Sequence, residues 1–149
     1  MIVLDTDVIS CVMRGSPPAL LVRRMAGFDP ADHATTANNL AELCFGATRS
    51  RRGPYFTEQI ERLVLPNLAI LPFDADAARH YGRLKADLEA RGTPLSEPDL
   101  RIASICVSKG AMLATGNVRH FDRVPGLVAQ DWLSGSRCLV VGGARRLGR

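Results

Sequence analysis

Short apolar segments alternate with longer segments of helical period along this chain. Apolar runs at residues 2–4, 68–71 and 111–114 predict buried strands, and the short segments 33–35 and 127–129 predict two more, the last at a sheet edge. Between them, the hydrophobic pattern predicts helices at about 17–26, 37–49, 55–65, 75–91 and 97–109. Strands separated by helices are typical of parallel sheets with crossover connections. The pattern therefore predicts an α/β fold, with a central parallel sheet flanked by helices.

Length and composition restrict the class of protein. The chain has 149 residues, enough for one domain with its own core and too few for two. With 46% hydrophobic and 23% charged residues, it is neither disordered nor collagen-like nor a coiled coil. No apolar run approaches the length of a membrane span, and the N-terminus lacks a basic signal region, so we expect a cytoplasmic protein. The four cysteines stand too far apart for a zinc site.

The net charge of +4 comes from the C-terminal end of the chain. Residues 134–149 hold four arginines and no acid, whereas the preceding residues carry 15 basic and 15 acidic side chains. We therefore expect one domain over residues 1–133, followed by a basic, flexible tail over residues 134–149. Arginine binds phosphate oxygens well, so this composition leaves nucleic acid as a possible partner without selecting it.

Acidic and polar side chains stand where predicted strands end or the following helices begin. They are Asp5 and Asp7 after the first strand, Glu42 and Asp99 early in their helices, and Thr115 and Asn117 after the strand at 111–114. Ligands of an open parallel sheet bind beyond the carboxyl ends of its strands, so these groups can meet in one pocket. Clustered carboxylates repel each other, and a divalent cation such as Mg²⁺ or Mn²⁺ removes that cost. Such an ion can activate water, so the pattern predicts metal-dependent phosphodiester hydrolysis.

Each of these acids has a structural alternative when it is considered alone. Asp5 and Asp7 can cap the helix that follows the first strand. Asp99 stands three residues after Ser96, the spacing of a capping box, and Glu42 can be an ordinary solvated residue of a helix face. The metal hypothesis depends on the acids occurring together.

Four blocks of sequence resemble the PIN-domain ribonucleases, in particular the VapC toxins of prokaryotic VapBC toxin–antitoxin pairs. The blocks are IVLDTDVIS at 2–10, NLAELCFGA at 39–47, PLSEPDLRIAS at 94–104 and LATGNVRHFDRVPGL at 113–127. They occur in the order and spacing of the family and cover residues 1 to about 133. The resemblance implies a three-layer PIN domain, endoribonuclease activity dependent on Mg²⁺ or Mn²⁺, and neutralisation by a cognate VapB-like antitoxin. It also implies a homodimer that acts on RNA, with no membrane association.

The resemblance assigns roles to individual residues. Asp5, Glu42 and Asp99 resemble the three acids that hold metal, and Thr6 and Thr115 resemble the polar residues beside the site. Asp7 is expected to support them or to cap its helix.

Two positions depart from the family pattern. Asn117 stands where many members have a fourth aspartate, so we expect it in the catalytic site as a weaker, neutral ligand. Gly116 stands where the family often has arginine, which we expect to weaken a phosphate contact. The histidines are scattered along the chain, so a histidine acid–base pair is not expected.

Three further arginines are candidates for binding RNA. Arg49, Arg51 and Arg52 follow the predicted helix of Glu42, where they can line an RNA groove or simply stand in solvent at a helix end.

Two other functions compete with the nuclease. Haloacid-dehalogenase-like phosphatases also have two acids after their first strand, and Asp5 and Asp7 match these, but the following threonine and the later Gly-Asp motif are missing. A catalytically inactive PIN-like binding module is the other alternative.

Overall fold

The computed structural model of the protein describes residues 1–133. Within these residues, five parallel strands form one sheet in the order β3-β2-β1-β4-β5. The strands are β1 (Ile2–Leu4), β2 (His33–Thr36), β3 (Ala69–Leu71), β4 (Met112–Thr115) and β5 (Ala129–Asp131). The predicted parallel sheet is confirmed. The expected tail over residues 134–149 lies outside the described residues.

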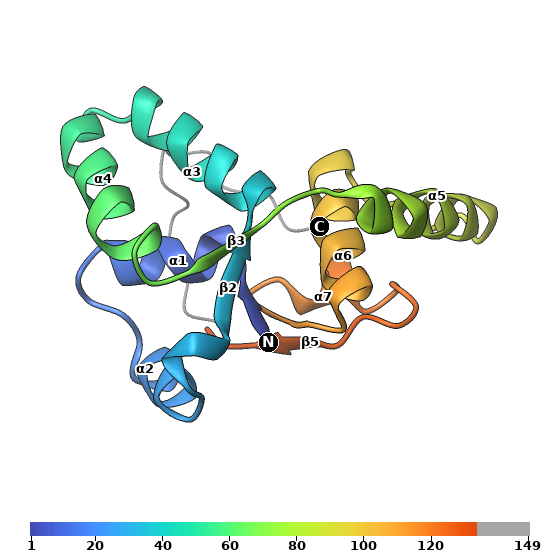
Figure 1. Cartoon of the computed structure of the whole chain (residues 1–149), viewed down its shortest axis with the longest axis horizontal. Coiled ribbons are helices and arrows are strands. Elements are labelled where there is room, and N and C mark those ends of the chain that lie inside the picture. The colour runs from blue at the N-terminus through green and yellow to red at the C-terminus, as the bar shows by residue number, and fades with distance from the viewer. Residues whose placement is uncertain (134–149) are drawn as a thin grey trace.

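Helices connect the strands and cover both faces of the sheet (Figure 1). One face carries α1 (Thr6–Met13), α2 (Ala19–Ala26), α3 (Ala37–Arg49), α4 (Gly53–Gln59) and the π-helix η2 (Ile60–Val64). The other face carries α5 (Ala75–Ala90), α6 (Glu97–Lys109) and α7 (Val118–Phe121). A short 3₁₀ turn, η1 (Pro30–Asp32), precedes β2. The predicted three-layer α/β architecture is confirmed.

The central strand shows how the sequence produces two cores. Successive side chains of a strand point to opposite faces of the sheet. Ile2 and Leu4 accordingly pack against α1, α3 and α4 on one face, whereas Val3 packs against α5 and α6 on the other. All three residues of β1 are buried, as expected for a strand covered on both faces. The apolar run at residues 2–4 is therefore the part of the sequence on which both layers depend.

The helices differ from the sequence prediction at three places. Helix α1 was not expected as a separate helix, and neither was the four-residue α7. The single helix expected at 55–65 is α4 followed by the π-helix η2. Helix α5 ends at Ala90, one residue before the predicted end, and Gly92 beyond it has a φ of 70°, the left-handed conformation that glycine adopts readily. Within residues 1–133, no helix is long and apolar enough to cross a membrane.

The strand order changes direction beside β1. The chain moves outward from β1 to β2 and β3, and then returns to place β4 on the other side of β1. The connections leaving the carboxyl ends of β1 and β4 therefore run to opposite faces, which opens a crevice between them. This switch point is where the candidate site should lie.

Candidate active site

Asp5 lies directly after β1, at the switch point of the sheet. Its Oδ1 accepts a hydrogen bond from the backbone N–H of Thr6 (2.8 Å), and its Oδ2 accepts one from the Thr115 hydroxyl at the end of β4 (2.9 Å). The side chain is buried, with 1% of its surface exposed. Asp5 is thus the cap of α1 and also a carboxylate at the carboxyl edge of the sheet, and its binding of a metal stays a prediction.

Thr6 connects the first strand to the helix that carries Glu42. Its hydroxyl lies 2.8 Å from Glu42 Oε2 and 3.0 Å from Asn39 Oδ1, and its single proton serves one acceptor at a time. The Asn39 side-chain amide donates in turn to the backbone carbonyl of Leu4 (3.2 Å). These bonds fix the start of α3 against the end of β1. Thr6 follows Asp5 in the chain, so its contact with Glu42, in the second turn of α3, links Glu42 to the residue next to Asp5.

Asp99 lies in the first turn of α6 and is also buried, with 5% of its surface exposed. The Ser96 side chain makes no capping bond, so the hydroxyl half of the capping box considered above is not formed. Instead, Asp99 Oδ2 lies 3.5 Å from Nδ1 of His120 in α7. The position of Asp99 is therefore better explained by the crevice than by helix capping.

The loop after β4 closes one side of the site. The Asn117 backbone N–H donates to the Thr115 hydroxyl (3.1 Å), and the Asn117 side-chain nitrogen lies 3.4 Å from His120 Nδ1. A ring nitrogen cannot accept from Asn117 and donate to Asp99 at once, so the two contacts belong to different tautomers. Asp7 anchors the loop from α1, because its Oδ2 accepts from the Gly116 backbone N–H (2.9 Å). Asp7 thus holds the loop after β4, and its support of a metal ligand stays a prediction.

A pocket of about 540 Å³ opens at this edge of the sheet. Its walls are Asn38 and Glu42 from α3, residues 96–99, 101 and 102 around the start of α6, and His120 from α7. Glu42 and Asp99 both line it, and Asp5, which is not among its lining residues, is joined to Glu42 through Thr6. The structure thus brings the three predicted acids, Thr6, Thr115 and Asn117 to one region of the molecule.

The donor groups fit a hard divalent cation. Carboxylate, hydroxyl and amide oxygens are the ligands that Mg²⁺ and Mn²⁺ prefer, and no cysteine is among the described residues that line the pocket. Over residues 1–133, however, no group of three or more His, Cys, Asp or Glu side chains lies close enough together to hold one ion. Binding by all three acids therefore requires side-chain rotation, and the metal site remains a prediction.

A buried cysteine lies near the site without being a candidate nucleophile. Cys106, in α6, is fully buried. Burial, and secondarily the negative charge of Asp5, raises the pKa of its thiol far above the usual value. Because only a thiolate is a good nucleophile, Cys106 is an inert part of the core.

Two residues of the site were missed by the sequence prediction. His120 was set aside with the scattered histidines, and Asn39 was not considered. Both stand three residues from a predicted site residue, His120 after Asn117 and Asn39 before Glu42. A spacing of three places side chains on one face of a helix, and this was the available signal.

The three arginines expected to bind RNA do not line the pocket. They lie at and beyond the far end of α3, where the guanidinium of Arg49 stacks 5.3 Å from the centre of the Phe45 ring and that of Arg52 stacks 4.2 Å from the Tyr55 ring. Arg51 is exposed. An RNA long enough to extend beyond the pocket is needed to reach them, and their role remains a prediction.

Comparison with known proteins identifies the family. The PIN domain family matches residues 2–127. The tRNA(fMet)-specific endonuclease VapC of Shigella flexneri is 32% identical over 129 residues, which cover 87% of this chain and 96% of that protein.

Solved structures agree with this match. The DNA-bound VapBC complex of Salmonella typhimurium contains a chain with a TM-score of 0.79 and 29% identity, covering 88% of this chain and 97% of that one. The VapBC-1 complex of nontypeable Haemophilus influenzae gives a TM-score of 0.78 and 30% identity, covering 89% of this chain and 98% of that one. With its three acids at the switch point of a five-stranded parallel sheet, this chain belongs to the PIN domain family and, within it, to the VapC ribonucleases.

Proposed function

We propose that this chain is the toxin of a type II toxin–antitoxin pair, an endoribonuclease that hydrolyses RNA phosphodiester bonds with Mg²⁺ or Mn²⁺ held by Asp5, Glu42 and Asp99. The observation that supports the proposal is that Glu42 and Asp99, from distant parts of the chain, line one pocket, with Asp5 linked to Glu42 through Thr6. Burying carboxylates costs free energy, and a cation beside them offsets that cost.

The residues around the acids have separate tasks. The Thr115 hydroxyl orients the carboxylate of Asp5, and the Thr6 hydroxyl orients that of Glu42, which positions both side chains for a ligand. When bound, the ion supplies a water of lowered pKa and offsets the charge that develops on the phosphate oxygens. His120 contacts Asp99 in one tautomer and Asn117 in the other, and so connects α7 to the start of α6 or to the loop after β4.

The partners follow from the family. The similar solved structures are VapBC complexes, and we extend this pairing to the present chain, with a cognate VapB-like antitoxin and a homodimer of the toxin. Coexpression with its antitoxin should give a complex of defined mass in light scattering. A toxin that stays monomeric and does not bind the antitoxin would contradict both the homodimer and the pairing.

RNA cleavage by the purified chain is the direct test. Cellular RNA is incubated with Mg²⁺, with Mn²⁺ or with EDTA, and the new 5′ ends are mapped. We expect discrete cuts with either metal and none with EDTA. RNA left intact with both metals would favour the inactive binding module over the nuclease.

The phosphatase alternative is disfavoured by the family match. It requires a covalent phosphoryl group on Asp5, whereas the proposed hydrolysis forms no phosphoenzyme. Absence of a phosphorylated Asp5 during RNA cleavage, measured by mass spectrometry, is the expected result.

Asn117 is expected to tune metal affinity. Asn117→Asp adds a charged ligand beside Asp99 and should lower the Mg²⁺ concentration for half-maximal cleavage about tenfold, whereas Asn117→Ala should raise it by a similar factor. The measurement is a Mg²⁺ titration of the cleavage rate for the three proteins. If both variants reach half-maximal cleavage at the same Mg²⁺ concentration as the unchanged chain, Asn117 has no part in the site.

A further inference from the structure

Arg101 brings a positive charge to a pocket that is otherwise acidic. It is the only Lys or Arg among the described residues lining the pocket, whose acids are Glu42, Glu97 and Asp99. Its side chain is 46% exposed, so it is accessible to a ligand. RNA approaching this pocket therefore meets Arg101 as the one permanent cation provided by the pocket's own side chains.

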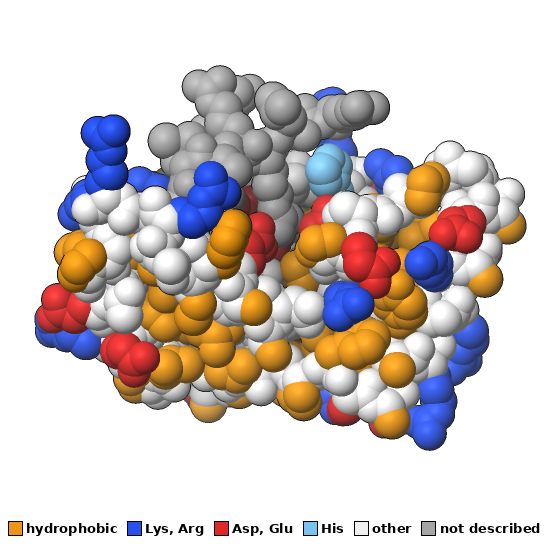
Figure 2. Space-filling model, turned by 90° about the horizontal axis from the view of Figure 1, so that it is seen from above, with side chains coloured by type: hydrophobic (Ala, Val, Ile, Leu, Met, Phe, Trp, Pro, Cys, Tyr) orange, Lys and Arg blue, Asp and Glu red, His pale blue; other side chains and the backbone are white. Residues whose placement is uncertain are grey.

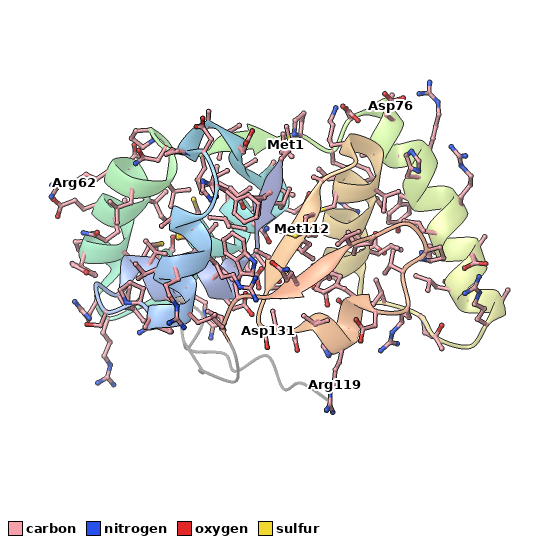
Figure 3. The ribbon with its side chains drawn as sticks, turned by 90° about the horizontal axis from the view of Figure 1, so that it is seen from below. Met1, Arg62, Asp76, Met112, Arg119 and Asp131 are labelled. Atoms are coloured by element: carbon pink, nitrogen blue, oxygen red, sulfur yellow. The ribbon has the colours of Figure 1, made fainter. Side chains whose placement is uncertain are left out.

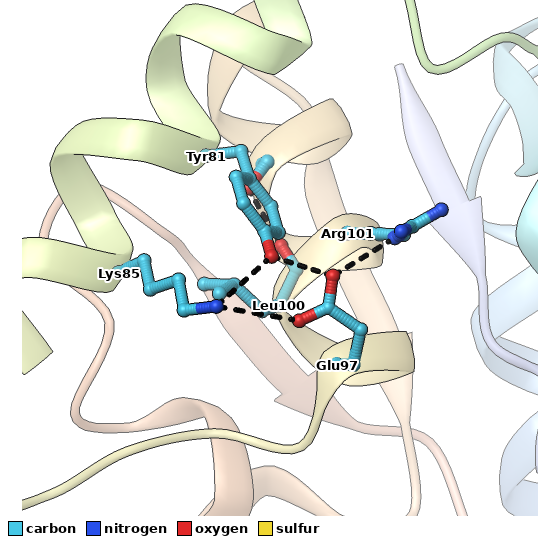
Figure 4. Close-up of polar contacts among 6 residues, drawn as sticks. Tyr81, Lys85, Glu97, Leu100 and Arg101 are labelled. Atoms are coloured by element: carbon cyan, nitrogen blue, oxygen red, sulfur yellow. Dashed lines mark hydrogen bonds and ion pairs between the residues drawn. The ribbon is translucent and has the colours of Figure 1, made fainter. Parts of the chain in front are cut away.

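The guanidinium of Arg101 is held on two sides. Its Nε donates to Glu97 Oε1 (3.2 Å), one helical turn earlier, and its Cζ lies 5.6 Å from the centre of the Phe73 ring. Figure 4 shows Nε facing Glu97 while the end of the guanidinium extends away from it. Since Nε serves Glu97, the two Nη groups remain to donate, and their planar arrangement matches two oxygens of a phosphate.

Residues of the neighbouring helix fix Glu97 in turn. The Tyr81 hydroxyl of α5 donates to Glu97 Oε1, and Lys85 Nζ lies 3.9 Å from Glu97 Oε2 (Figure 4). Glu97 is therefore held from α5, and this fixes the carboxylate that Arg101 contacts.

This arrangement exceeds what an ordinary surface ion pair needs. Arg62 and Glu58 form a pair of the same i,i+4 spacing, at 3.4 Å, but within residues 1–133 neither has a ring or a hydroxyl group as a further partner. Exposed ion pairs contribute little to stability, so stability gives little reason to hold Arg101 with both a carboxylate and a ring, or to hold that carboxylate from α5. Acidic and basic side chains are also interspersed on the face shown in Figure 2, so phosphate binding there depends on individual cations.

We propose that Arg101 binds an RNA phosphate next to the scissile one, and that Glu97 and Tyr81 position its guanidinium for this contact. The inference rests on the proposed nuclease function and adds a residue that sets where the RNA lies in the pocket. Arg101 lines the same pocket as Glu42 and Asp99, so a phosphate bound by it there lies near these acids. Lysine cannot replace this contact, because an ammonium group presents no planar fork.

The affinity for RNA tests the contact with Arg101. Binding of a short fluorescein-labelled single-stranded RNA is measured by anisotropy in EDTA, where no cleavage is expected. Arg101→Gln should weaken binding about tenfold, and the slope of log K against log salt should fall by about 0.7, the loss of one phosphate contact. Arg101→Lys should recover less than half of the loss on a logarithmic scale.

Arg62→Gln is the matched control. Figure 3 shows Arg62 at the outer edge of the molecule opposite α5, and the substitution removes the same charge from the same kind of ion pair. Affinity and salt slope should stay close to those of the unchanged chain. Equal effects of the two substitutions would overturn the proposal, because the loss would then reflect net charge alone.

Tyr81→Phe tests the positioning role separately. It removes the hydroxyl that bonds Glu97 and keeps the ring that packs edge-on against Phe73. In Mg²⁺, KM for RNA cleavage should rise about threefold with kcat unchanged, and the change should vanish in an Arg101→Gln background. A fall in melting temperature with KM unchanged would show a structural role and refute the positioning role.

These measurements distinguish the two proposals. If the unchanged chain cleaves no RNA with either metal, the nuclease function fails, whatever the anisotropy shows. If cleavage occurs and Arg101→Gln changes neither KM nor affinity, the nuclease stands and the role of Arg101 fails.

Discussion

An Asp99→Asn protein is expected to cleave RNA about a thousandfold more slowly than the unchanged chain. Asparagine keeps the shape of the side chain and one oxygen, but it removes the charge with which Asp99 would bind a cation. A metal ion contributes several kcal/mol to stabilising the transition state, and each 1.4 kcal/mol changes the rate tenfold. Single-turnover cleavage of a labelled RNA in Mg²⁺ measures this loss. Asp5→Asn and Glu42→Gln are expected to act in the same direction.

The fold should survive this substitution. Asp76→Asn is the control, because Asp76 occupies the first turn of α5 as Asp99 occupies the first turn of α6. Asp76 is exposed on the outer part of α5 and pairs with Arg79 (Figure 3). Each variant loses one first-turn charge, worth about 0.3–1 kcal/mol to a helix, so their melting temperatures should fall by similar amounts. Cleavage by Asp99→Asn at the rate of the Asp76→Asn protein would remove Asp99 from the chemistry.

The sheet and the placement of the acids could be predicted because both depend on local signals. A run such as residues 2–4 is apolar at every position, as expected of a strand buried on two faces. Parallel strands then bring their carboxyl ends to one edge. Asp5 and Thr115 are far apart in the sequence, yet this rule alone predicts the neighbourhood in which they bond.

Helix α1 could not be predicted in the same way. Four of its residues, Thr6, Val8, Ile9 and Val12, are β-branched, and such side chains favour strands over helices when judged locally. Its helical form is stabilised instead by the Asp5 cap and by burial of Val8 and Ile9 against the sheet. Tertiary packing therefore overrides the local preference, and the sequence pattern does not report this.

The polar groups around the acids were harder still to predict. Glu97 and Arg101 show their pairing in the sequence, since they are four residues apart, but Tyr81 belongs to a different helix. His120 reaches Asp99 only because α7, a helix of four residues with no detectable period, turns it into the crevice. Contacts of this kind depend on how helices pack against each other, which hydrophobic periodicity does not determine.

Gly116→Ala is expected to destabilise the protein by about 1–3 kcal/mol and to reduce RNA cleavage. A Cβ at this position would lie 2.7 Å from Leu133 Cδ1 and 2.9 Å from Asp7 Oδ2, closer than such atoms approach in proteins. Leu133 is buried and Asp7 bonds the Gly116 N–H, so a shift of either side chain to relieve the clash disturbs contacts that hold the loop. Asn117 lies in that loop and contacts His120, which lies 3.5 Å from Asp99. The family often has arginine at this position. Any side chain here would place a Cβ in this clash, so the absence of arginine has a steric reason in this chain.

Gly82→Ala provides the opposite expectation within the same chain. Gly82 lies inside α5, and a Cβ there would meet nothing within 4 Å. Alanine is the better helix former, so this variant should gain about 0.5–1 kcal/mol and cleave RNA at the unchanged rate. Urea unfolding of both variants measures the difference, with cleavage assayed where each is fully folded. If Gly116→Ala were as stable and active as Gly82→Ala, the contact of Gly116 with Asp7 and Leu133 would have no part in holding the site, because both substitutions add the same methyl group.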